Sequence, residues 1–180
     1  MPIPTFLARA AILAMAVAGL SATASAQTPK QIGTFGAWQA YAAGAKPTTC
    51  YISAKPTKSE PAAAKRGDIF LLVTFRKGAD GKTASRNEVS LIAGYTYKDQ
   101  SDVELTASGL KYLLFTQGDG AWARDARTDD EIVGALKRAR SLTVKGTSAR
   151  GTATTDTFSL DGFEKAMAAA TKACGIKPAA

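Results

Sequence analysis

The chain has 180 residues, no histidine and two cysteines, and its formal net charge at neutral pH is +8. Without histidine it has no Ser-His-Asp or Cys-His nucleophile system, and a catalytic zinc site is disfavoured because such sites use imidazole ligands. The positive balance favours contact with anionic surfaces, although a solvated basic face of an exported protein has the same composition.

The first 26 residues have the pattern of a signal peptide. Arg9 precedes an apolar run, Ala10 to Leu20, which is shorter than the roughly 20 residues of a membrane-spanning helix. Ala24-Ser25-Ala26 matches an A-x-A cleavage site. We therefore expect cleavage near Ala26 and a periplasmic or secreted protein. Residues 27–180 have a length that suits one domain with a hydrophobic core.

Alternation of apolar and polar residues predicts about eight strands. In chain order they are expected at 35–41, 49–55, 69–75, 88–95, 102–106, 110–117, 141–145 and 152–160. The stretch 56–67 is rich in proline, lysine and alanine and is expected to be an exposed loop. The spacing of the turn signals is typical of a β-sandwich, so the sequence predicts a mainly β fold with two short helices.

Both helices have recognisable ends. In the first, over 128–139, Thr128 and Glu131 have the spacing of a capping box. In the second, Asp161 is the expected N-cap, with Glu164 three residues on, and Gly175 ends the helix.

The two cysteines, Cys50 and Cys174, are expected to pair because exported proteins form stable disulfides. A redox-active pair more often has C-x-x-C spacing, so we interpret this pair as structural.

Two sets of residues are candidates for binding. The basic group, Lys137, Arg138, Arg140 and Lys145, has more cations than the dipole of the first helix requires, which predicts a weak site for anionic lipid or lipopolysaccharide. Trp38 and Trp122 are candidate aromatic anchors, with core packing as the alternative for each. The export signal disfavours nucleic acid as a partner.

No motif marks a catalytic residue. The stretch GADGKT lacks the first glycine of a phosphate-binding loop, since Arg76 stands there. Asp102 and Glu104 alternate with apolar residues and are expected on the solvent face of a strand. We expect no catalytic residue, metal ligand or cofactor. Two alternatives remain: a small periplasmic hydrolase of Ser-Lys or carboxylate type, and a secreted inhibitor or binding module that uses a loop such as 56–67.

Several short segments together resemble one known family. The order FGAW, CYISAKP, a β-rich middle, the DDEIVGALK helix and FSLDGFEKAM is similar to the invasion-associated locus B family of exported α-proteobacterial proteins. Gly36-x-Trp38 and Ser159 to Phe163 are the most specific parts. The resemblance implies an immunoglobulin-like β-sandwich and a non-enzymatic envelope role whose partner is an unknown protein or envelope component. Some members are linked to host-cell entry, and additional cysteines that are common in the family are missing here.

Overall fold

The computed structural model describes residues 28–176, apart from 45, 63–64, 79 and 81. The expected signal peptide, residues 1–26, lies outside the described residues, so the cleavage site and the extent of the domain stay predictions. The described part of the chain contains eleven strands and two helices: β1 Pro29–Phe35, β2 Trp38–Ala43, β3 Thr49–Ala54, β4 Lys58–Glu60, β5 Phe70–Lys77, β6 Thr83–Ile92, β7 Asp102–Ala107, β8 Leu110–Gln117, β9 Gly120–Trp122, α1 Ala126–Arg138, β10 Ser141–Thr147, β11 Ala153–Ser159 and α2 Phe163–Ala173.

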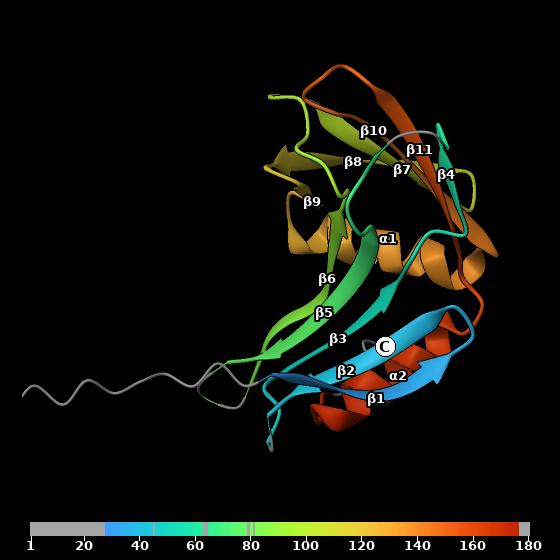
Figure 1. The fold of residues 1–180 in the computed structure, drawn as a ribbon. Helices are drawn as coiled ribbons and strands as arrows, with labels where there is room; N and C mark the ends of the chain where they lie inside the picture. The colour runs from blue at the N-terminus through green and yellow to red at the C-terminus, as the bar shows by residue number, and fades with distance from the viewer. Residues whose placement is uncertain (1–27, 45, 63–64, 79, 81, 177–180) are drawn as a thin grey trace, which may run out of the picture.

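The strands form one antiparallel sheet in the order β1-β2-β3-β5-β6-β9-β8-β7-β10-β11-β4 (Figure 1). The expectation of a mainly β fold with two helices is confirmed. The immunoglobulin-like sandwich is not shown, because the described strands hydrogen-bond into one sheet instead of two. Period-two alternation tells which face of a strand is buried, but it does not tell whether two strands share a sheet.

Two short segments differ from the expected elements. The predicted strand 35–41 is divided by a turn, so that Phe35 ends β1 and Trp38 begins β2. The predicted loop 56–67 contains the short edge strand β4, which pairs with β11. Turns and three-residue strands give weak periodic signals because too few residues alternate.

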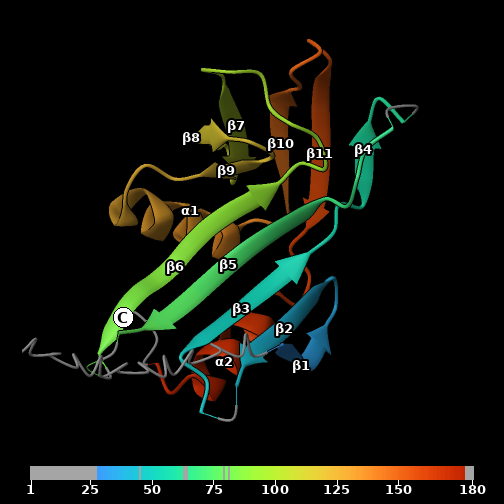
Figure 2. The ribbon, with the colours of Figure 1, turned by 60° about the vertical axis from the view of Figure 1, so that its left-hand side comes forward.

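One face of the sheet carries the core. Inward residues recur at every second position, as in Ala40, Ile52, Val73 and Val89, all of which are fully buried. Helix α2 packs on β1, β2 and β3, while α1 packs mainly on β6 and reaches β7 and β8 (Figures 1 and 2). An antiparallel sheet with one buried face explains the alternation seen in the sequence. In the described residues no helix has both the length and the apolar character to cross a membrane.

The two segments most specific to the family resemblance lie against each other. The Ala37 amide donates to the carbonyl of Asp161 at 3.1 Å, and Trp38 Nε1 donates to the carbonyl of Ser159 at 3.0 Å. The Trp38 ring packs edge-on against Phe163, with centroids 4.9 Å apart. Gly162 has φ +82°, and an added Cβ would strike the carbonyl of Phe35, so glycine is required there. These segments join the start of the sheet to the start of α2.

Both helix N-termini differ from the expected capping. Helix α1 begins at Ala126, and its N-cap is Asp125, whose carboxylate accepts from the Thr128 amide at 2.8 Å. That hydrogen bond holds the pKa of the Asp125 carboxyl below its usual range. Helix α2 has Gly162 as its N-cap and no side-chain capping bond, so the prediction of Asp161 as N-cap was wrong. The close approach of the β1–β2 turn determines the backbone at that point.

Asp129 connects α1 to β6. Its side chain accepts a hydrogen bond from the Val89 amide at 2.8 Å, and the residue is buried. The pKa of Asp129 is raised from its ordinary 3.8 to about 6, chiefly by burial and in addition by the nearby Glu88 and Asp130 carboxylates, although the Val89 bond acts in the opposite direction. The folded protein therefore favours the neutral acid more strongly than the unfolded chain does.

We expect Asp129→Asn to stabilise the protein at pH 7.5 by on the order of 1 to 3 kcal/mol. Because the folded pKa is raised, the stabilising effect of the neutral acid is complete below about pH 4 and is lost as the pH rises through 6. The amide keeps an acceptor for the Val89 N–H and carries no charge. Urea midpoints of wild type and variant should differ at pH 7.5 and converge near pH 4; an equal difference at both pH values would contradict this explanation.

Candidate functional site

A polar recess of about 430 Å³ lies where three connecting segments meet. It receives residues from the segment after β4, from the segment after β6, from the β10–β11 turn and from the start of β11: Pro61, Lys65, Arg66, Tyr95, Ser148, Arg150, Thr152 and Thr154. Among its lining residues, Ser148 and Thr154 are buried, whereas Lys65 and Arg150, the rim cations, are exposed. The recess therefore combines buried hydroxyls with exposed cations.

Arg66 fixes one wall of the recess. Its guanidinium donates to both carboxylate oxygens of Asp156, at 2.8 and 2.7 Å, and twice to the carbonyl of Ala93, at 3.0 and 2.8 Å. The side chains of Arg66 and Asp156 are only 6% and 3% exposed. Because Arg66 bonds both to the carbonyl of Ala93, just after β6, and to Asp156 of β11, it joins segments that are far apart in the strand order of the sheet.

Tyrosine rings pack around this ion pair. The Arg66 guanidinium lies 4.8 Å from the ring centroid of Tyr95, and the Tyr95 hydroxyl is 2.6 Å from Thr154 Oγ1. Burial raises the pKa of Tyr95, although its bond to Thr154 and the Arg66 charge partly oppose the shift. Burial also raises the pKa of Tyr97, whose ring packs edge-on against Tyr95. Both phenols are therefore neutral hydrogen-bonding groups at physiological pH.

Small residues make this packing possible. The Gly67 amide donates to the carbonyl of Gly94 at 2.8 Å, which brings the Arg66 segment onto the end of β6. Gly94 has φ +70°, and a Cβ there would strike the Gly67 carbonyl. At Gly146, a Cβ would lie 2.7 Å from the Tyr97 ring, so β10 also needs a residue without a side chain.

The predicted basic group is partly brought together. Lys137 and Arg138 form the last turn of α1, Arg140 follows directly, and all three are exposed. Lys145 lies farther along β10, opposite Glu104 of β7. A hydrogen bond from Lys111 lowers the pKa of Glu104, and the Lys145 charge adds to that effect. Lys145 therefore faces an acidic neighbour, and none of the four residues lines the recess.

The two tryptophans differ in how deeply they are buried. Trp38 is fully buried in the core, so of its two interpretations core packing is confirmed and the exposed aromatic anchor is wrong. Its packing on Phe163 explains the burial. Trp122 is half-buried on β9 and packs against Phe115, with ring centroids 5.8 Å apart.

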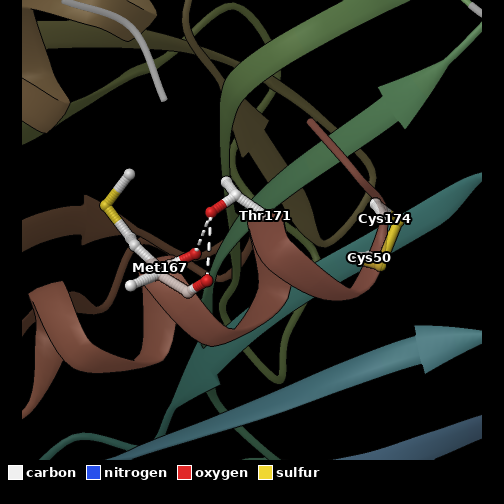
Figure 3. The surroundings of a disulfide bond; sticks show 5 residues. Cys50, Met167, Thr171 and Cys174 are labelled. Carbon is white, nitrogen blue, oxygen red and sulfur yellow. Dashed lines mark hydrogen bonds between the residues drawn. A yellow bond between two sulfur atoms is a disulfide. The ribbon is translucent and has the colours of Figure 1, made fainter. Parts of the chain in front are cut away.

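The disulfide Cys50–Cys174 is present, as predicted. It joins β3 to the C-terminal end of α2, with a Cα–Cα distance of 6.0 Å (Figure 3). One turn earlier, the buried Thr171 hydroxyl donates to the carbonyl of Met167 at 2.8 Å. The bond therefore holds the C-terminal end of α2 on the sheet, and neither cysteine lines the recess.

No residue of the recess was singled out from the sequence, although the loop 56–67 was given as the binding loop of one alternative function. Lys65 and Arg66 lie in the segment 56–67 that was predicted to be an exposed loop, and the side chain of Arg66 is almost fully buried. One signal was present: Asp156 alternates with Thr154 and Phe158 on the inward face of β11. A carboxylate at an inward position needs a buried cation, and Arg66 is that cation.

The fold is that of a small, mainly β protein in which two helices pack on the sheet and one disulfide joins the sheet to the second helix. The family model described as "Invasion associated locus B (IalB) protein" matches residues 38–171, and the chain belongs to this family. No curated protein and no solved structure gave a significant match.

Proposed function

We propose that this IalB-family protein is exported, is periplasmic or secreted after cleavage near Ala26, and has a non-enzymatic role at the cell envelope. The family membership and the structural disulfide support export, since such bonds persist in oxidising compartments. The proposed role is association with an anionic envelope component, such as acidic lipid or lipopolysaccharide. Any part in host-cell entry would follow from this association.

One observation carries the proposal: the exposed cations at the end of α1. Lys137, Arg138 and Arg140 follow one another closely, and none forms an ion pair within the described residues. The helix dipole favours one or two cations in the last turn, at about 0.3 to 1 kcal/mol each. The additional charge is available to an anionic surface, where each basic residue contributes about 1 kcal/mol.

We expect the protein to co-sediment with vesicles rich in anionic phospholipid at low salt. Lys137→Glu/Arg138→Glu/Arg140→Glu should weaken this binding by roughly 100-fold, because three favourable contacts of about 1 kcal/mol each are lost. Wild-type binding should fall steeply with salt, since the Debye length is only about 8 Å at physiological ionic strength.

The matched control is Lys30→Glu/Lys46→Glu/Lys172→Glu, which changes the net charge equally at exposed lysines elsewhere. We expect it to bind markedly better than the variant at the end of α1. If wild type ignores anionic vesicles at low salt, or if both variants lose binding equally, the proposed surface at the end of α1 is wrong.

A further inference from the structure

We propose that the polar recess is a second, separate binding site that takes a phosphate monoester, or a similar dianionic oxyanion, on a small polyhydroxylated carrier. This proposal does not depend on the surface at the end of α1, which shares no residue with the recess. The family description assigns no site to this part of the chain.

The charge of the recess favours a dianion. Three basic side chains line it, Lys65, Arg66 and Arg150, and one carboxylate, Asp156, is bound to Arg66. Two positive charges are therefore unmatched. Lys65 and Arg150 are the exposed ones, and neither forms an ion pair within the described ranges. Charge-assisted hydrogen bonds from such groups to phosphate oxygens are among the strongest polar contacts in proteins.

The hydrogen-bonding groups also favour an acceptor-rich ligand. Ser148 Oγ accepts from the Thr152 amide at 3.1 Å, so its own hydrogen remains available to donate. Arg66 has five N–H groups, and four of them account for its bonds to Asp156 and Ala93. One guanidinium N–H, the Ser148 hydroxyl and the exposed Thr152 hydroxyl are thus free to donate to an oxyanion.

The volume of the recess and its other lining residues indicate that the ligand has a further group, the carrier, in addition to the anion. A volume of about 430 Å³ lies within the range of small-molecule sites and is larger than one oxyanion needs. Pro61 offers an apolar surface, and the Tyr95 and Thr154 hydroxyl oxygens can accept hydrogen bonds from a sugar. A carrier with hydroxyl groups matches these walls better than an acyl chain does.

The residues that hold the shape of the recess differ from those that supply its exposed charge. The Arg66–Asp156 pair and the buried hydroxyls hold the shape, whereas Lys65 and Arg150 project from exposed rim positions. Changing the rim cations should therefore remove binding and leave the fold unchanged. Arg66 is unsuitable for this test because its loss would affect both binding and folding.

The test is isothermal titration calorimetry of the purified protein at low ionic strength with inorganic phosphate, glucose 6-phosphate and glucose. We expect glucose 6-phosphate to bind more tightly than inorganic phosphate and glucose not to bind. Lys65→Gln/Arg150→Gln should weaken glucose 6-phosphate binding by roughly 100-fold, about tenfold for each charge-assisted contact. Thr152→Val should weaken it several-fold.

The matched control Lys30→Gln/Lys46→Gln removes the same charge outside the recess and should bind as wild type does. All variants should keep the wild-type unfolding midpoint, because the changed side chains are exposed. Binding should persist in Lys137→Glu/Arg138→Glu/Arg140→Glu, which separates this site from the envelope-binding surface. If neither phosphate compound binds at millimolar concentration, or if the rim variant binds normally, the proposal is overturned; if inorganic phosphate binds as tightly as the sugar phosphate, the inferred carrier is wrong.

Discussion

Replacing Arg66 with alanine should destabilise the protein by about 3 to 5 kcal/mol. The change leaves the Asp156 carboxylate buried at 3% exposure without its two charge-assisted hydrogen bonds. It also removes two donors from the carbonyl of Ala93 and the cation above the Tyr95 ring. The measurement is urea unfolding at neutral pH, followed by tryptophan fluorescence.

Two further variants make this prediction specific. Arg76→Ala removes an exposed ion pair with Glu88 and should cost less than about 1 kcal/mol. Arg66→Met/Asp156→Leu removes both buried charges together and should be much less destabilised than the sum of the single variants, since no charge is left unpaired. An Arg66→Ala variant within 1 kcal/mol of wild type would show that Asp156 finds another partner or becomes protonated without difficulty.

The Cys50→Ala/Cys174→Ala variant should lose about 3 to 5 kcal/mol of stability. The disulfide closes a loop with a sequence separation of 124. In the chain-entropy model such a loop contributes roughly 5 kcal/mol, and measured contributions are often smaller. Guanidinium unfolding of oxidised wild type and of the double variant gives the difference directly.

Reduction provides the control for the disulfide. Oxidised wild type should have no thiol that reacts with an alkylating agent under denaturing conditions, and dithiothreitol should bring its unfolding midpoint close to that of the double variant. The double variant itself should not respond to dithiothreitol. Two alkylatable cysteines in freshly isolated wild-type protein, or a midpoint unaffected by reduction, would contradict the predicted effect.

The elements that were predicted well have long, regular patterns. β7 alternates over its six residues, β5 and β8 are rich in apolar residues over eight residues each, and α1 has an apolar stripe along most of its length. Cys50 and Cys174 were paired correctly because an exported chain with two cysteines offers one intramolecular pairing. For the strands and the helix, the local sequence repeats its pattern often enough to determine the element. For the cysteines, only one pairing within the chain is possible.

The features that were missed depend on contacts between distant segments. No local pattern indicates that the strands share one sheet, that Trp38 lies beneath Phe163, or that Gly162 is the N-cap of α2. The recess was missed for the same reason, since Lys65 and Arg150 approach it from opposite parts of the chain. Lys65 is next to Arg66, whose ion pair with Asp156 joins this segment to β11, the strand that follows the turn containing Arg150.

The position of α2 determines the order in which the protein can fold. Strands β1 to β3 are synthesised first, but the helix that covers them consists of residues 163–173, near the end of the chain. The apolar side of the N-terminal hairpin therefore stays uncovered until almost the whole chain is available. Contacts at such long sequence separation form slowly because a large loop must close first. Native packing of the N-terminal third of the domain thus follows completion of the chain.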